Sequence, residues 1–555
     1  MITATPDVAS TGQPAGKPSG VASLGVLGAG TMGAGIAQVA LAAGLHVRLY
    51  DPLPASRERA AAAIAAGLER LANKGRLTPQ AREAAVAALL LVEEVDALAG
   101  VDALIEAVPE DLNLKRRVLS EALAVVSADA LVASNTSSLS ITALAAGLPS
   151  PGRVVGLHFF NPVAAMALVE VVRGDASDEE ALRRATALVT ELGKTAIACD
   201  DTPGFIVNRV ARPFYGEALR LVGDHGATPE AVDQVLTLAA GFKMGPFALM
   251  DLIGIDVNLA VSTTVWEAFY GEPRFRPHPL QRRMVDSGRL GRKVGRGFYA
   301  YPAGPPPAPP PAVSPAFLRL AFVGQAPALD GWARALHAAG HAVAIFGDAR
   351  ELPADEAWDG GFELGDAPPD ERAARRARLA AALPGHAWLA SDDLVVTATE
   401  VEVATGRAAW RLASWPVGGE GPAGLEVAFP PHAEPALRGQ VQGLLGSLGR
   451  VAVAVPDLPG LVGPRTVAML VNEAAFAVEG GVAAPEAIDL AMRLGTGYPL
   501  GPLAWADAIG PDRVVALLRA LQGALGERYR PAPWLVRRAS AGWPLADAPA
   551  ASAWR

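Results

Sequence analysis

One stretch constrains the fold of this chain more than any other: residues 23–51, which read SLGVLGAGTMGAGIAQVALAAGLHVRLYD. Its pattern is typical of a buried strand, a glycine turn, a helix and a second strand. Gly28, Gly30 and Gly33 form a G-x-G-x-x-G motif, whose glycines permit a tight turn, close approach of a pyrophosphate and close helix–strand packing. The stretch therefore predicts a strand–helix–strand dinucleotide unit, with a simple packing turn as the alternative.

The residues around this motif indicate which dinucleotide would bind. The helix that begins after Gly30, at Thr31 and Met32, offers its first N–H groups and its positive dipole to the phosphates. Asp51 ends the second strand, 18 residues after Gly33. A carboxylate there can accept the ribose hydroxyls and repels a 2′-phosphate, so NAD is favoured over NADP.

Polar side chains follow the next two predicted strands, at ends that face the cofactor crevice in such sheets. Glu110 follows the strand 103–107, and Lys115 lies in the first turn of the helix after it. A second strand runs into Asn135, Thr136, Ser137 and Ser138. We interpret Ser137 as a nicotinamide or substrate contact, with capping of the helix near Ser140 as the alternative.

His158 and Glu170 are the two ionisable residues of the apolar stretch LHFFNPVAAMALVEVV. The two strands that carry them are joined by a short loop containing a proline, so the two side chains can meet. A carboxylate that holds an imidazole in one tautomer raises its basicity, as a base that deprotonates a hydroxyl requires. A satisfied core histidine is the alternative interpretation.

These motifs together resemble the L-3-hydroxyacyl-CoA dehydrogenase family over residues 21–301. The resemblance rests on GAGTMG with Asp51, on NTSSLSI, on GLHFFNPVAAMALVEVV, on DTPGFIVNR and on GRKVGRGFYAY. It implies NAD-dependent oxidation of a 3-hydroxyacyl-CoA to a 3-ketoacyl-CoA, with His158 as base and Glu170 as its orienting partner. It also implies NAD contacts from Asp51, Glu110, Lys115, Ser137 and Asn161, and substrate contacts from Ser137, Asn161, Asn208 and Lys74.

Two of these assignments keep an alternative. Asn208 lies where DDTPGFIVNR also reads as the start of a helix. Lys74 lies in NKGRLT, where an ordinary solvated turn is an equal interpretation of the pattern.

The second half of the chain repeats the first at an offset of 256 residues. TPGFIVNRV at Thr202 parallels LPGLVGPRT at Leu458, and Glu217, Pro229 and Asp233 find identical residues at the same offset. A gapless match of this length predicts an internal repeat. In this second copy (residues 316–548) the glycine motif has decayed to Gly324-Gln325-Ala326, and we expect a sheet with fewer strands. The offset puts Ser414, Glu426 and Pro464 in place of His158, Glu170 and Asn208, respectively.

The predicted fold is therefore an α/β Rossmann-type NAD-binding domain plus an all-α domain, followed by a degenerate repeat of both, with one active site per chain. The retained Glu426 is interpreted as chance. In shorter relatives two helical domains pair across a homodimer, and here the second copy can supply that contact. The expected segments are 1–20 (disordered), 21–200 (NAD-binding), 201–301 (helical), 302–315 (proline-rich linker), 316–456 (degenerate Rossmann-like) and 457–548 (second helical).

Bulk properties limit the other function classes. The net charge of −9 shows no nucleic-acid footprint, and no signal peptide or membrane span is expected. Cys199 is the single cysteine, which suits a reducing cytoplasm and a buried strand position. No metal site is expected, and acyl-CoA is the expected partner.

The acyl group itself stays open. In its length the chain resembles the long bacterial members of this family. That resemblance implies 3-hydroxyadipyl-CoA as the substrate and a role in phenylacetate catabolism. The alternatives are 3-hydroxybutyryl-CoA, a free 3-hydroxyacid and a noncatalytic NAD-binding role.

Overall fold

The computed structural model describes residues 18–301, 317–324, 327–353, 356–365, 367–413 and 423–547. By its internal contacts the chain divides into two units, Met1–Phe205 and Ile206–Arg555. Most of the expected disordered N-terminus and the whole proline-rich linker 302–315 lie outside the described residues.

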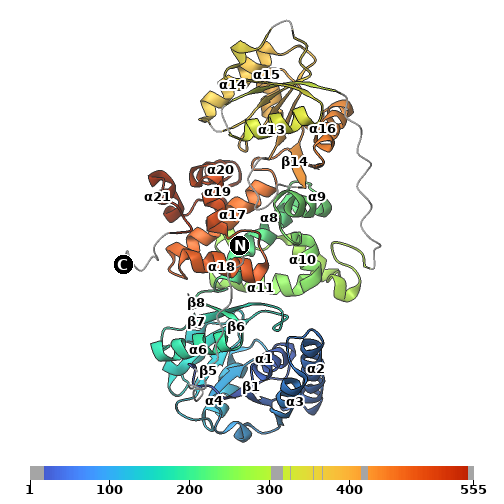
Figure 1. The fold of residues 1–555 in the computed structure, drawn as a ribbon. Helices are drawn as coiled ribbons and strands as arrows, with labels where there is room; N and C mark the ends of the chain where they lie inside the picture. The colour runs from blue at the N-terminus through green and yellow to red at the C-terminus, as the bar shows by residue number, and fades with distance from the viewer. Residues whose placement is uncertain are drawn as a thin grey trace, which may run out of the picture. The chain divides into compact units, whose positions relative to one another are not determined.

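The first unit is built on one eight-stranded sheet in the order β3-β2-β1-β4-β5-β6-β7-β8 (Figure 1). All neighbours pair in parallel except β6 and β7, which are antiparallel and place His158 directly opposite Glu170. Cys199 lies buried in β8, as the sequence predicts. The strands are β1 Ser23–Leu27, β2 His46–Tyr50, β3 Leu89–Val92, β4 Ala103–Glu106, β5 Leu131–Ser134, β6 Val154–Phe159, β7 Leu168–Arg173 and β8 Thr195–Asp200.

Helices cover this sheet, and polar side chains begin several of them. The side chains of Thr78, Asp111 and Ser140 accept N–H groups at the starts of α3, α4 and α5, so each is an N-cap. One large apolar core joins the sheet to α1, α2 and α6. The helices are α1 Thr31–Ala42, α2 Pro54–Asn73, α3 Pro79–Ala87, α4 Leu112–Leu123, α5 Ile141–Ala145 and α6 Glu179–Glu191, with 3₁₀ turns η1 Val95–Leu98 and η2 Pro151–Arg153.

The second unit begins with a helical segment, and a buried aspartate of this segment binds the segment's C-terminal stretch. Asp251 accepts the backbone N–H groups of Phe298 and Tyr299, at 2.9 and 3.0 Å. The stretch GRKVGRGFYAY, residues 291–301, therefore closes this segment. The elements are α7 Val207–Val210, α8 Arg212–Gly223, α9 Pro229–Gln234, the π-helix η3 Val235–Ala239, α10 Pro246–Ile253, α11 Ile255–Ala268, η4 Pro273–Phe275, α12 Pro279–Asp286 and η5 Arg292–Val294.

A smaller α/β layer follows in the same unit. Within the described residues its sheet has seven strands in the order β10-β9-β11-β12-β13-β14-β15, one fewer than the first sheet, which confirms the expected reduction. The strands are β9 Arg319–Val323, β10 Ala342–Phe346, β11 Gly360–Glu363, β12 Trp388–Ser391, β13 Ala409–Leu412, β14 Gly424–Ala428 and β15 Val451–Val455. The helices are α13 Pro327–Ala338, η6 Ala349–Glu351, α14 Pro369–Ala382, α15 Ala398–Thr405 and α16 Pro435–Ser447.

The unit ends with a second helical segment that packs on the first. Helix α17 lies against α8, and Figure 1 shows the red helices beside the green ones. Asp507 accepts Leu545 N and Ala546 N at 2.7 and 2.9 Å, just as Asp251 holds the tail of the first segment. The elements are α17 Gly463–Glu479, α18 Pro485–Thr496, α19 Pro502–Ile509, α20 Pro511–Leu525, η7 Glu527–Tyr529 and α21 Pro533–Ala541.

The strand register corrects one detail of the repeat. In the second copy β13 and β14 pair antiparallel, and Ala413 N donates to Glu426 O at 3.1 Å. The residue opposite Glu426, and thus the counterpart of His158, is Ala413; the 256-residue offset pointed to Ser414, which lies outside the described residues. The second copy still lacks the imidazole.

Glu426 itself was also misinterpreted, because it has a structural role. Its buried carboxylate accepts Val462 N and Gly463 N, the latter at 3.0 Å, at the start of α17. A carboxylate at a helix N-terminus satisfies N–H groups that have no partner inside the helix. Its retention is therefore explained by helix capping rather than by chance.

Candidate active site

The glycine loop between β1 and α1 has the shape that a pyrophosphate requires. Gly28 has a φ of +101°, and a Cβ there would lie 2.7 Å from Ala107 O. A Cβ on Gly33 would lie 1.8 Å from Gly28 O, so the helix packs tightly on the turn. A Cβ on Gly30 would meet nothing within 4 Å, so the loop is open there. These residues fit a dinucleotide cradle in which only Gly30 faces open space.

Asp51 holds this loop from the end of β2. Its carboxylate oxygens accept Ala29 N at 2.9 Å and Leu53 N at 3.0 Å. A carboxylate can accept about four hydrogen bonds, so these two leave capacity for ribose hydroxyls. Helix α1 begins at Thr31 without a side-chain cap, so its first N–H groups are not taken by a neighbouring side chain. The arrangement suits the phosphates and one ribose of a dinucleotide.

Glu110 and Ser137 lie together at the carboxyl ends of β4 and β5. The Glu110 carboxylate accepts Thr136 Oγ1 at 2.6 Å, Ser137 N at 2.9 Å and Ser138 Oγ at 2.9 Å. Burial alone would raise the pKa of Glu110, but Lys115 and these donors outweigh it and lower the pKa. Glu110 therefore stays ionised and orders the loop that presents Ser137.

Lys115 is deeper than its predicted role as a cofactor contact suggests. It is 1% exposed, and its ammonium donates to Glu106 Oε1 at 2.7 Å and to Val108 O at 3.0 Å. It also pairs with Glu110 at 3.2 Å, and Ser134 Oγ donates to the other oxygen of Glu106 at 2.5 Å. The ammonium thus links the sheet interior to the loop of Glu110.

Glu106 is a residue of this network that the sequence interpretation missed. The signal that could have found it lies in the second copy, where Glu363, Arg372 and Ser391 recur at the spacing of Glu106, Lys115 and Ser134. There Arg372 Nη2 and Ser391 Oγ each donate to Glu363 Oε2 at 2.8 Å. Because the network persists where the glycine motif has decayed, it belongs to the packing of this sheet.

His158 and Glu170 form a tight buried pair across the antiparallel strands β6 and β7. The distance from His158 Nδ1 to Glu170 Oε2 is 2.6 Å, and the two residues are 5% and 0% exposed. The rings of Phe160 and Phe205 lie 4.4 and 5.8 Å from the imidazole. Among the described residues none hydrogen-bonds Nε2 of His158. The pair can hold the imidazole so that Nε2 is left for a ligand.

The other predicted residues lie in different places. Asn161 is exposed in the loop after β6, next to a cis peptide bond with Pro162. Lys74 is exposed at the C-cap of α2. Asn208 belongs to the second unit, where it lies in α7 and its backbone carbonyl accepts Arg212 Nε at 2.6 Å. Within the described residues no group of three or more His, Cys, Asp or Glu side chains could hold a metal ion.

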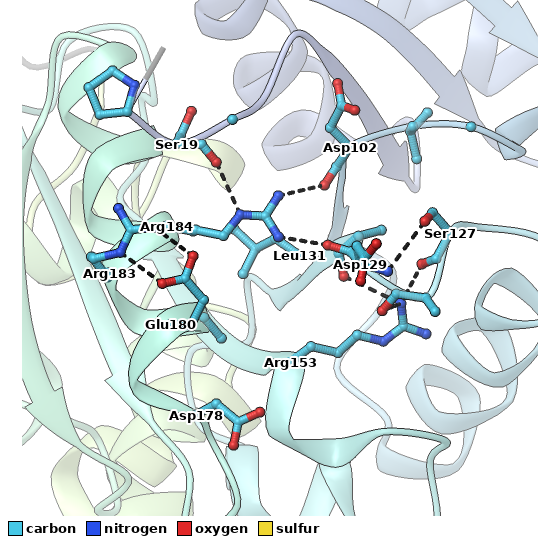
Figure 2. Close-up of a pocket in the computed structure, with 17 residues that line it drawn as sticks. Ser19, Asp102, Ser127, Asp129, Leu131, Arg153, Asp178, Glu180, Arg183 and Arg184 are labelled. Carbon is cyan, nitrogen blue, oxygen red and sulfur yellow. Dashed lines mark hydrogen bonds and ion pairs between the residues drawn. The ribbon is translucent and has the colours of Figure 1, made fainter. Parts of the chain in front are cut away.

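A hollow also exists at the opposite edge of the first sheet (Figure 2). It lies at the amino ends of the strands, and Figure 2 shows Arg184 donating to backbone oxygens of Ser19, Asp102 and Asp129. Arg183 pairs with Glu180 in the same hollow. Its cations are therefore engaged already, and ligands of such sheets bind at the carboxyl ends. We do not assign the active site there.

Comparison with known proteins decides the family. Residues 23–202 match the 3-hydroxyacyl-CoA dehydrogenase NAD-binding domain, and residues 204–301 and 460–548 each match the C-terminal domain of the same family. The chain belongs to the 3-hydroxyacyl-CoA dehydrogenase family. It is an oxidoreductase of this type, as the sequence predicts, and the double match to the C-terminal domain confirms the internal repeat.

Individual relatives point to two acyl groups. The chain is 38% identical over 523 residues to 3-hydroxyadipyl-CoA dehydrogenase of Escherichia coli K12, covering 94% of this chain and 98% of that one. It resembles a solved 3-hydroxybutyryl-CoA dehydrogenase of the same organism with a TM-score of 0.76 and 35% identity, covering 94% and 98% of the two chains. A solved (S)-3-hydroxybutyryl-CoA dehydrogenase of Ralstonia eutropha matches 51% of this chain and all of its own, with 40% identity and a TM-score of 0.50.

Among the described residues no single helix is long and apolar enough to span a membrane; α10 and α11, which meet at a sharp bend, reach that length and composition only when they are taken together.

Proposed function

We propose that this chain oxidises (S)-3-hydroxyadipyl-CoA with NAD, using His158 as general base in a single active site. The observation that carries the proposal is the 2.6 Å contact between His158 Nδ1 and Glu170, in the unit that also holds the open glycine loop. An imidazole held by a carboxylate through one nitrogen has its other nitrogen available to accept a proton. That is what oxidation of a secondary alcohol requires.

The reacting carbon is C3 of the acyl group. His158 Nε2 takes the proton of the C3 hydroxyl, and the electron pair of that O–H bond forms the new carbonyl as hydride leaves C3. Bound NAD supplies the acceptor for that hydride. Glu170 keeps the imidazole in position and stabilises the imidazolium that forms. Ser137 and Asn208 hydrogen-bond the oxygen while its charge changes.

The cofactor would be held by residues of the first unit. Gly28, Gly30 and Gly33, with the N–H groups of Thr31 and Met32, receive the pyrophosphate, and Asp51 receives the adenosine ribose. Glu110, Ser137 and Asn161 contact the nicotinamide half. Lys115 acts through Glu110, because its ammonium is buried between Glu106 and Glu110. Lys74, exposed at the end of α2, is proposed to meet a phosphate of coenzyme A.

The adipyl substrate is favoured by the relative that matches this chain over nearly its full length. The butyryl substrate is the second candidate, because the structural relative of equal coverage has that name. A role in phenylacetate catabolism in the cytoplasm stays a prediction of the sequence. It also stays a prediction that the second copy supplies, within one chain, the contact between helical domains that two chains make in a homodimer.

Steady-state kinetics of the reverse reaction test the proposal. NADH oxidation is followed with 3-ketoadipyl-CoA, 3-ketohexanoyl-CoA, acetoacetyl-CoA and a free 3-ketoacid, and we expect the highest kcat/KM with the adipyl thioester. Turnover of the free acid alone would point to a hydroxyacid dehydrogenase. If NADH is oxidised with none of the thioesters, the chain is not a 3-hydroxyacyl-CoA dehydrogenase in function, and NAD binding without turnover would identify a noncatalytic protein.

A further inference from the structure

Arg212 is a buried cation one helical turn beyond Asn208. It is 7% exposed and begins α8; its Nε donates to Asn208 O at 2.6 Å and one Nη to Ser262 Oγ at 3.1 Å. The guanidinium lies over the ring of Tyr215, 5.1 Å from its centre. A guanidinium has five N–H donors, and these two contacts engage two of them.

What sets Arg212 apart is that no carboxylate neutralises it among the described residues. Of the other buried arginines of this helical region, Arg209 binds Glu473 and Arg465 binds Glu217. Arg220 donates to two backbone oxygens and feels the charge of Glu217. Burial lowers the pKa of Arg212, and within the described part of the chain the hydroxyls of Tyr215 and Tyr498 act against this. An unpaired buried charge is costly in a folded protein and is kept where an anion binds or a network needs it.

A second unsatisfied polar group lies beside it. The hydroxyl of Tyr498 is buried and has no hydrogen-bond partner within the described part of the chain. The ring of Tyr498 is fixed by Phe242 at 4.9 Å and by Phe214 at 5.9 Å. Buried hydroxyls nearly always have partners, so an unsatisfied one next to an unpaired guanidinium indicates a missing acceptor. Tyr498 comes from the second helical segment, whereas Arg212 comes from the first.

The internal repeat shows that the fold does not need this cation. At the 256-residue offset Arg212 corresponds to Ala468 and Tyr498 corresponds to Phe242. Ala468 is fully buried in α17, which forms a regular helix of 17 residues. The equivalent helix therefore packs well with a methyl group at this position. The guanidinium of Arg212 is thus better explained by binding than by packing.

We propose that Arg212, with the hydroxyl of Tyr498, binds the terminal carboxylate of a dicarboxylyl-CoA substrate. The inference rests on the proposed function, which places Asn208 beside C3 of the acyl group. Residues one turn apart on a helix have Cβ atoms about 5–6 Å apart. Three C–C bonds of about 1.5 Å each separate C3 of an adipyl chain from its terminal carboxylate, a span of roughly 4 Å, and a charged hydrogen bond adds about 2.8 Å. The guanidinium of Arg212 lies at Asn208, with Nε 2.6 Å from Asn208 O, so a chain of this length with C3 at Asn208 can reach it.

The decisive measurement is a preference ratio in the full chain. The kcat/KM for 3-ketoadipyl-CoA is divided by that for 3-ketohexanoyl-CoA, which has the same length and no terminal charge. Because a hydrogen bond to a charged group is worth about ten- to a hundredfold in binding, we expect Arg212→Gln to lower this ratio by that factor. Tyr498→Phe should lower it less, since it removes one neutral donor. Lys243→Gln is the matched control: Lys243 is an exposed cation beside Gly497, and its loss should leave the ratio unchanged.

Calorimetric titration with the nonreacting adipyl-CoA and hexanoyl-CoA gives the same ratio without turnover. Arg212→Ala, which introduces the residue of the second copy, gives a second test if the glutamine variant folds poorly. Equal loss on both ligands, or a fall in the ratio with Lys243→Gln instead, would overturn the inference. If the parent chain turns over 3-ketohexanoyl-CoA at least as well as 3-ketoadipyl-CoA, this inference fails while the dehydrogenase function stands; if neither is turned over, the proposed function itself fails.

Discussion

Arg465 donates to Glu217 at 2.8 Å in the buried centre of the second unit, and Arg209 donates to Glu473 at 2.7 Å. The two pairs exchange partners, because each arginine and each glutamate has its counterpart 256 residues away. A contact in which residue i meets j and j meets i is the mark of two-fold pairing. Here both halves of the pairing belong to one chain.

These exchanged pairs should carry much of the stability of the helical region. Glu217 also accepts Tyr529 Oη at 2.7 Å, so Glu217→Gln leaves two buried arginines without their anion. Breaking a buried pair from one side costs about 3–5 kcal/mol, and we expect urea unfolding to show a loss of that size. Glu180→Gln, at an exposed pair with Arg183, is the control and should leave the unfolding midpoint unchanged. Equal midpoints for both variants would contradict the prediction.

The glycine loop yields a prediction that separates cofactor binding from folding. Gly30→Ala adds a Cβ in open space, so the protein should fold normally while the methyl group obstructs the pyrophosphate. We expect NAD affinity to fall by about tenfold or more in calorimetric titration, with unfolding in the absence of NAD close to the parent. Gly33→Ala is the contrast, since its Cβ would lie 1.8 Å from Gly28 O and should destabilise the fold.

The same titration counts the nucleotide sites. We expect one NAD per chain, because the second copy has lost the glycines that follow Gly324. A stoichiometry of two would show that the smaller α/β layer still binds a dinucleotide.

Substitutions of His158 and Glu170 should lower kcat to different extents. His158→Ala removes the proton acceptor, and kcat should fall by about a hundred- to ten-thousandfold. Glu170→Gln keeps an acceptor for His158 Nδ1 but removes the charge, so a smaller fall in kcat is expected. NAD binding should persist in both variants, which serves as the folding control. Activity of the alanine variant within tenfold of the parent would exclude His158 as the base.

Glu426 should make stability depend on pH in an unusual direction. Burial raises the pKa of Glu426 to about 7, although two backbone N–H groups and Arg411 act against it. The native state then binds this proton more tightly than the unfolded chain, whose glutamate has an ordinary pKa. The stability that Glu426 contributes is full below about pH 4.5 and is lost as pH rises to 7, by roughly 3 kcal/mol in total.

The matched comparison is Glu426→Gln, which cannot ionise. The free energy of unfolding of the parent, minus that of the variant, is measured in urea at several pH values between 5 and 8. It should decrease as pH rises, because contributions from all other groups cancel in the difference. A difference that is constant with pH, or that increases, would contradict the assignment.

The long elements and the repeat could be predicted because each rests on a periodic pattern or on many matching residues. The sequence analysis predicts no strand at Leu89–Val92, where the structure has the short strand β3. Four apolar residues fit a strand and a helix equally well, and only pairing with β2 decides between them.

The site residues show a similar division. Strand ends could be located from the sequence, so Glu110, Ser137 and His158 lie at the carboxyl ends of strands, where they were expected, while their roles stay predictions. Glu106 was hidden inside an apolar strand, and what reveals it is its partner Lys115 in α4 together with the same spacing in the second copy. The counterpart of His158 was displaced by one residue, since a fixed offset ignores a change in loop length whereas strand register follows hydrogen bonds.

The exchanged contacts of the helical segments have a consequence for how such a site can arise. In a dimer of identical chains every substitution appears on both sides of the two-fold axis. A cation that is gained on one side is therefore also present on the other side. A chain that holds both halves can change one side alone. Arg212 and Tyr498 lie together on one side, whereas Ala468 and Phe242 hold the equivalent positions. Fusion of the two halves thus permits an asymmetric polar site on an otherwise symmetric scaffold.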